Sequence, residues 1–247
     1  MNDISANDAV EEVELVSRSN VPSGLDYTKY KNYLRHDFFY SCAYCTMSEA
    51  EASAIPFSID HYESQVARPD LRNDYNNLMY ACIPCNTRKS DRTVPAAARK
   101  DGIHFFRPDE DKFTEHFIRD GLLLKDISKC GEFTIDALDL NRAMLRRLRE
   151  IRDRLHNCDE MVAQGIRALR GFRIDQLPPN IRIAAMKAIR QVDQTQISVA
   201  SNLDNILRES AQSPLLQEDE DRAQRQKERK QRLKGTEALY PGTVWRG

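Results

Sequence analysis

The chain has no long run of apolar residues, and its charges of opposite sign nearly cancel. None of its 247 residues fall in a stretch approaching the roughly 20 consecutive apolar residues that a membrane-spanning helix requires. Lys and Arg number 37 against 38 Asp and Glu, a formal net charge of −1. We therefore expect no membrane segment, and any cationic surface for a nucleic acid must be local.

The first residues also lack the features of a secretory leader. MNDISANDAVEEVELV is acidic and contains neither a basic start nor an apolar stretch. Lipidation and twin-arginine motifs are absent as well. These absences predict a cytoplasmic protein with reduced thiols, in which six cysteines favour metal ligands or buried thiols over a disulfide framework.

Four of the cysteines form two Cys-x-x-Cys pairs, Cys42 with Cys45 and Cys82 with Cys85. This spacing lets both sulfurs of a pair point at one ion from a tight turn, and two pairs make a closed, structural zinc site. Chance burial of the thiols or a redox Cys-x-x-Cys are the alternatives. The chain shows no thioredoxin-like βαβ pattern to favour the redox alternative.

The segment between and after these pairs contains Ile59-Asp60-His61, Asn77-Leu78 and Cys85-Asn86. In order and interleaving with the cysteines, this string resembles the HNH endonuclease family. The resemblance covers about residues 38–92 and implies a ββα-metal fold. It implies that His61 is the general base, that Asp60 and Asn86 hold a catalytic cation, and that Asn77 orients the loop carrying His61.

The chemistry of these residue types agrees with that assignment. Hydrolysis of a phosphodiester needs an activated water and a cation against the growing charge. A carboxylate and an amide oxygen suit Mg²⁺, with Mn²⁺ as the alternative. An unperturbed histidine has a pKa of about 6.5, so His61 is expected to accept a proton from water near neutral pH. Because neighbours on a strand point to opposite faces, Asp60 and His61 serve one site only if the strand twists or ends there.

Basic residues follow the last cysteine pair. Arg88, Lys89 and Arg92 are predicted to contact nucleic-acid phosphates, although a solvated basic face is the alternative. Six arginines between residues 142 and 154 have the same two interpretations, a DNA-backbone clamp or a solvated face. Tyrosines at 27, 30 and 33 favour a packing face over base stacking.

The remaining pattern predicts an α+β protein with a small zinc-stapled, treble-clef-like ββα-metal core followed by a mainly α-helical extension. We expect an acidic arm at 1–24, the nuclease domain at 25–112, a strand and helix extension packed on it at 113–172, and a helical C-terminal region with a charged tail at 173–247.

Individual elements are predicted from local signals. Asp26 is expected to cap a short helix, 38–40 to be a strand, and 113–127 a strand-turn element continuing through 132–135. A helix should begin after Asp139. The helical spacing of apolar residues over 180–210 predicts a helical hairpin or a dimer seam. The charged and polar residues at 217–235 predict a solvated helix or a disordered tail.

The function that follows is metal-dependent endonuclease activity, most simply on DNA, with RNA as an alternative because both share the phosphate. The near-neutral charge favours targeting by a partner, such as an ATPase subunit, or by dimerisation through 180–210. Such an arrangement fits the effector nuclease of a bacterial anti-phage or restriction system. A non-catalytic zinc module that binds nucleic acid or a protein is the competing class of function.

Overall fold

The structure is a computed structural model that describes residues 15–52, 54–170, 187 and 222–241. The chain divides into two compact units, of which the first comprises residues 1–118, 125–140 and 228–247 and the second the remainder. No helix among the described residues is long and apolar enough to cross a membrane. Residues 1–14 of the predicted arm at 1–24 and nearly all of 180–210 lie outside the described residues, so the helical hairpin or dimer seam remains a prediction.

A short helical segment opens the described part of the first unit. The 3-10 helix η1 (Tyr27–Tyr30) leads directly into α1 (Lys31–Asp37), and Tyr30 and Leu34 are buried. The Asp26 side chain accepts a hydrogen bond from Thr28 N, which confirms the predicted cap. Of the three tyrosines, only Tyr30 is fully buried, so they form a packing face only in part.

After α1 the chain reverses direction at residues 38–40, where a strand was expected. Phe39 and Tyr40 both have positive φ angles, and an isolated bridge joins Ser41 to Ser48. A strand residue has a negative φ, so that prediction is wrong.

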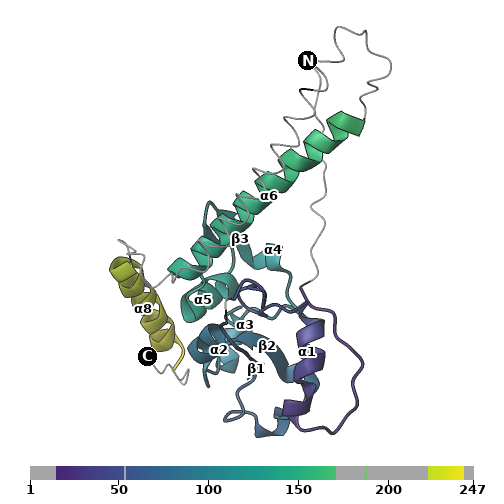
Figure 1. The fold of residues 1–247 in the computed structure, drawn as a ribbon. Helices are drawn as coiled ribbons and strands as arrows, with labels where there is room; N and C mark the ends of the chain where they lie inside the picture. Colours follow the sequence, from purple (N-terminus) through teal and green to yellow (C-terminus); the bar gives the residue numbers. More distant parts are fainter. Residues whose placement is uncertain (1–14, 53, 171–186, 188–221, 242–247) are drawn as a thin grey trace, which may run out of the picture. The chain divides into compact units, whose positions relative to one another are not determined.

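Two strands and a helix follow (Figure 1). β1 (Phe57–His61) pairs antiparallel with β2 (Leu78–Cys82), and α2 (Ile83–Lys89) begins at once after β2. Every residue of β2 is buried, so this strand is the centre of the core. The connection between the strands includes two short 3-10 helices, η2 (Pro69–Leu71) and η3 (Tyr75–Asn77).

The next elements are α3 (Ala96–Lys100), α4 (Phe113–His116), a hairpin of β3 (Phe117–Asp120) with β4 (Leu123–Asp126), and α5 (Lys129–Leu138). The hairpin confirms the predicted strand-turn element over 117–126, whereas its first part, 113–116, is helical. Its expected continuation through 132–135 is wrong, because Ser128 accepts a hydrogen bond from Gly131 N and starts a helix there. Burial of nearly the whole helix then outweighs the β propensity of Thr134 and Ile135.

Two further helices complete the described chain. α6 (Ala143–Arg170) begins after Asp139 as predicted and buries Leu145, Leu148 and Ile151. α8 (Arg222–Leu239) has no buried residue, in agreement with the solvated-helix alternative. The mixture of helices and small sheets fits the predicted fold class, whereas the treble-clef comparison and the packing of the extension remain predictions.

Candidate functional site

The four paired cysteines converge. Candidate ligand atoms of Cys42, Cys45, Cys82 and Cys85 all lie within 4.8 Å of one another, and the Cys45 and Cys82 sulfurs are 3.7 Å apart. Four sulfurs at about 2.3 Å from a tetrahedral zinc ion are separated by about 3.8 Å. Three of the cysteines are buried and Cys45 is half-buried. The geometry therefore fits one zinc ion with no open position.

Backbone hydrogen bonds shape the first cysteine pair and tie it to the sheet. Thr46 N donates to Cys42 O, and Cys42 N donates to Met47 O, so the pair sits in a tight turn. Ala43 N donates to Tyr80 O on β2. The second pair spans the end of β2 and the first turn of α2, so the four sulfurs join the turn, the strand and the helix.

Asp60 lies inside this core and has two partners. Its carboxylate accepts a hydrogen bond of 2.5 Å from Tyr44 Oη and pairs with Lys89 Nζ, which is 3.1 Å from Oδ2. Lys89 has no exposed side-chain surface, and its ammonium also donates to His61 O at 2.6 Å. Burial, with the charge of Asp60, raises the pKa of Tyr44 far above its usual value, so Tyr44 is a hydrogen-bond donor.

This pairing corrects one expectation about the basic residues. A phosphate in solvent cannot reach an ammonium that is fully buried and engaged by a carboxylate and a backbone carbonyl. Lys89 is consequently not placed as a nucleic-acid contact. It fixes the carboxylate of Asp60 and the backbone of His61 relative to α2.

His61 is the last residue of β1, so the strand ends where the sequence required it to end or twist. Its Nε2 donates to Arg72 O at 2.8 Å, and its Nδ1 accepts from Gln65 Nε2 at 3.0 Å. A carbonyl can only accept, so the proton is on Nε2 and the lone pair on Nδ1. Burial lowers the pKa of His61 below 6.5, which keeps the ring neutral at physiological pH.

Asn77 ties together the loop that follows His61. Its Oδ1 accepts from Glu63 N at 2.8 Å, and its Nδ2 donates to Glu63 O at 3.0 Å and to Leu71 O at 3.2 Å. The segment between the two carbonyls includes Gln65, and Arg72 follows directly, so Asn77 indirectly holds both partners of the His61 ring. It contacts neither His61 nor Asp60 in these bonds.

Asn86 lies on α2, one turn before Lys89. Its Nδ2 donates to Ser58 Oγ at 2.7 Å and to Ile59 O at 3.3 Å. Ser58 and Asp60 are two residues apart on β1 and share one face of the strand. Asn86 and Asp60 are thereby brought to the same face. No hydrogen bond from the described residues to Asn86 Oδ1 is found, and that oxygen is the donor atom that a hard cation would use.

The other two predicted phosphate contacts are held by the protein. Arg88 donates to Pro84 O at 2.9 Å and lies 3.9 Å from Asp139 Oδ2. Arg92 donates to the Arg88 carbonyl and, at 3.2 Å, to Ala137 O. Burial, with the charge of Arg229, lowers the pKa of Arg92. Both side chains therefore link α2 to the end of α5, and their contact with phosphates remains a prediction.

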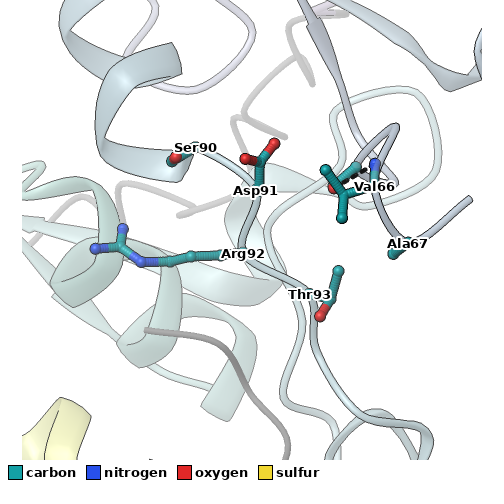
Figure 2. A pocket seen from close by; sticks show the side chains of 7 residues that line it. Val66, Ala67, Ser90, Asp91, Arg92 and Thr93 are labelled. Atoms are coloured by element: carbon teal, nitrogen blue, oxygen red, sulfur yellow. Dashed lines mark hydrogen bonds between the residues drawn. The ribbon is translucent and has the colours of Figure 1, made fainter. Parts of the chain in front are cut away.

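A pocket of about 310 Å³ lies between the loop after His61 and the segment after α2 (Figure 2). Its lining consists of Ser64, Val66, Ala67 and residues 90–93. The guanidinium of Arg92 is turned away from Val66 and Ala67. The pocket is thus lined by short side chains. Ser64 lies three residues after His61, and Ser90 directly follows Lys89.

Two residues beside His61 were not predicted to belong to the site. The Tyr27 ring packs edge-on against the His61 ring with centroids 4.9 Å apart, and the Arg72 guanidinium lies 5.4 Å from the Tyr27 centroid. Arg72 is exposed and Tyr27 half-buried. The sequence gives no local signal for this meeting, because Tyr27 precedes His61 by more than thirty residues.

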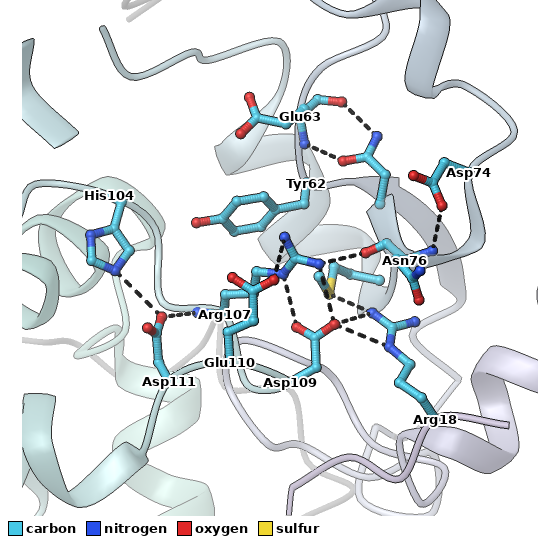
Figure 3. Close-up of polar contacts among 12 residues, drawn as sticks. Arg18, Tyr62, Glu63, Asp74, Asn76, His104, Arg107, Asp109, Glu110 and Asp111 are labelled. Atoms are coloured by element: carbon cyan, nitrogen blue, oxygen red, sulfur yellow. Dashed lines mark hydrogen bonds and ion pairs between the residues drawn. The ribbon is translucent and has the colours of Figure 1, made fainter. Parts of the chain in front are cut away.

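Charged side chains anchor the base of β2 (Figure 3). Arg18 donates to Leu78 O at 2.9 Å. It also pairs with Asp109 at 2.8 Å, as Figure 3 shows. Arg107 also pairs with Asp109, at 3.0 Å, and donates to Asn76 O at 2.7 Å. These contacts hold the end of the loop that Asn77 organises.

An antiparallel strand pair, a following helix and a four-cysteine cluster define a small zinc-binding unit with polar groups at the strand end. The family model described as HNH endonuclease matches residues 42–92, which confirms the resemblance found in the sequence. The match supports a nuclease of the HNH family and covers only this segment. Neither the curated proteins nor the solved structures gave a match.

Proposed function

We propose that the site on β1 and α2 is a metal-dependent endonuclease site that hydrolyses phosphodiester bonds in DNA. The observation that carries the proposal is the state of His61 within the matched segment. A neutral imidazole is held by a carbonyl at Nε2, and its Nδ1 lone pair is the acceptor. An oriented neutral base of this kind can take a proton from water.

In the proposed reaction, a water replaces the Gln65 amide at Nδ1 of His61. Gln65 donates to the lone pair that must accept the proton of the water, so the amide competes with the nucleophile. The bond from Nε2 to Arg72 O holds the ring while its charge changes. Asn77 keeps the loop in place during that step.

Asp60 and Asn86 are the residues that would hold the cation. A carboxylate and an amide oxygen are hard donors, and Asn86 is held over the strand that carries Asp60. So few protein ligands would leave positions for water and phosphate oxygens, as Mg²⁺ prefers. Bound there, the cation would stabilise negative charge on the phosphate. Lys89 and Tyr44 position the Asp60 carboxylate, although the Lys89 charge also weakens its attraction for a second cation.

We assign the contact with a backbone phosphate to Arg72 in place of Lys89. Arg72 is exposed and adjoins His61 through its own carbonyl, so its guanidinium is the cation best placed for a backbone phosphate. Tyr27 lies beneath it and offers a ring to a neighbouring sugar or base. The near-neutral net charge supports targeting by a partner protein, as in an anti-phage or restriction effector.

The test is cleavage of supercoiled plasmid by the full chain with Mg²⁺ or Mn²⁺. The natural chain should cut, and His61→Ala should lose on the order of 10²–10⁴-fold in rate. His156→Ala replaces an exposed histidine outside the site and should cut normally. Equal cutting by the natural chain and His61→Ala would remove the base assignment, and cutting of RNA but not plasmid would replace the proposed substrate.

A further inference from the structure

A second cluster of metal-ligand side chains lies in the first unit, apart from the four cysteines. Candidate ligand atoms of His104, Asp111 and Cys130 all lie within 4.8 Å of one another. His116 adjoins them, with its Nε2 3.9 Å from Asp111 Oδ1. None of these residues contributes to the proposed nuclease site.

Three separate segments supply the cluster. His104 lies in the loop after α3, and Cys130 is in the first turn of α5. Asp111 precedes α4, and His116 is the last residue of that helix. A Cβ at Gly131 would lie 2.1 Å from His116 O, so only glycine allows α5 to approach α4 this closely. The close approach brings Cys130 toward the two histidines.

The distances among His104, Asp111 and Cys130 suit one tetrahedral ion, whereas His116 lies outside this group of three and must move closer to act as a fourth ligand. His104 Nε2 is 3.5 Å from Asp111 Oδ2, close to the roughly 3.4 Å between two ligands that are each about 2.1 Å from zinc. Cys130 is 1% exposed, whereas the side chains of His104 and Asp111 are 28% and 18% exposed. A thiol at the inner end and imidazole and carboxylate at the outer end leave an entry path for an ion.

Hydrogen bonds from outside the cluster orient the ligands. Ser128 Oγ lies 2.7 Å from His116 Nδ1, so Nε2 of that ring faces Asp111. Arg107 N donates to Asp111 Oδ2 at 2.7 Å and holds the carboxylate, while the ion pair of His104 with Asp111 is visible in Figure 3. Such outer contacts are characteristic of metal-binding histidines and carboxylates.

We propose that His104, Asp111 and Cys130 bind a second zinc ion, with His116 as the fourth ligand. One thiolate, imidazole nitrogens and one carboxylate are the donor types that select zinc over Mg²⁺ or Ca²⁺. With four protein ligands the site is closed, so its role is to join α4, α5 and the loop after α3. It is independent of both the four-cysteine ion and the nuclease chemistry.

The test counts zinc in the purified full chain after extensive dialysis. The natural chain should hold two zinc ions per chain, and Cys130→Ala and His104→Gln should each hold one. His36→Gln changes an exposed histidine outside both clusters and should retain two. When the chain is loaded with Co²⁺, both sites should contribute sulfur-to-cobalt absorption. Cys130→Ala should lose the contribution of the second site and keep the bands of the four-cysteine site.

Two results would overturn the inference. One is a natural chain with a single zinc ion, in which case the cluster is a hydrogen-bonded group around Asp111. The other is a natural chain with two ions whose count is unchanged in both variants. His104→Gln alters a partly exposed side chain, so it keeps the test valid if Cys130→Ala fails to fold.

Discussion

The Lys89 ammonium lies 3.1 Å from Asp60 Oδ2 in a part of the core where the lysine is wholly covered and the carboxylate is 4% exposed. The same ammonium donates to the carbonyl of His61. A buried pair of this kind adds little net stability, but it leaves a costly unpaired charge when one member is removed. It also fixes two adjacent candidate site residues against one helix.

Replacement of Lys89 should therefore destabilise the protein strongly. We expect Lys89→Met to lower the free energy of unfolding by about 3–5 kcal/mol, because Asp60 is left buried without its counter-charge. Lys29→Met, on the exposed side of η1, should have little effect. Denaturant unfolding measures both.

The double variant Asp60→Asn with Lys89→Met should recover part of that loss, since it removes both charges. A Lys89→Met protein as stable as the natural chain would show that the pair does not form.

The pH dependence of cleavage should report His61. Burial lowers the pKa of His61 below 6.5, and only the neutral ring can accept a proton. As the pH falls through that pKa, the rate should fall, and the midpoint should lie below pH 6.5. Plasmid cleavage at fixed Mg²⁺ across pH 5–8 measures it. A midpoint above 6.5 would mean that another group limits the rate.

Asn77 and Asn76 provide a matched pair of variants. Asn77→Ala removes three hydrogen bonds to the backbone of the loop after His61, each worth about 1 kcal/mol, and should reduce both stability and cleavage. Asn76→Ala changes an exposed neighbour that bonds to Asp74 and Arg107 through its backbone N–H and C=O. Thermal unfolding and cleavage rates should separate the two, and equal behaviour would show that the Asn77 amide has no positioning role.

Removal of zinc should unfold the nuclease segment. The four sulfurs join the turn at Cys42 to the end of β2, and apolar packing alone must hold them once the ion is removed. Treatment with a strong chelator should lower the unfolding temperature. Zn²⁺ should restore it and Mg²⁺ should not. An unfolding temperature that does not respond to the chelator would argue against a zinc site.

The contact of α8 with Asp136 gives a prediction about proteolysis. Arg232 donates to both oxygens of Asp136, at 2.5 and 2.7 Å, and the carboxylate is almost fully buried. Arg232→Ala should speed cleavage of α8 by trypsin, whereas Lys230→Ala, at an exposed position, should not. Both changes remove one trypsin site, so the comparison isolates the anchoring.

The sequence was most informative where the signal is local. The two Cys-x-x-Cys pairs predict a metal cluster because each pair shares one turn, and Asp26 predicts a cap from its neighbours alone. Lys89 was misassigned because a lysine in a basic run looks solvated. Its burial depends on Asp60, which lies 29 residues earlier and meets it only after β1 and β2 pair. The contacts of Gln65, Arg72 and Tyr27 with His61 are equally non-local.

The pairing of β1 with β2 sets Asp60 opposite Met79 and His61 opposite Leu78. Side chains on a strand alternate between its faces, so a slip of one residue would exchange the two positions. The imidazole would then meet Lys89, and the carboxylate would face the loop. Insertion of a single residue into β1 should thus abolish the site while every one of its side chains remains present. The alignment of two five-residue strands is as much a determinant of the site as the side chains themselves.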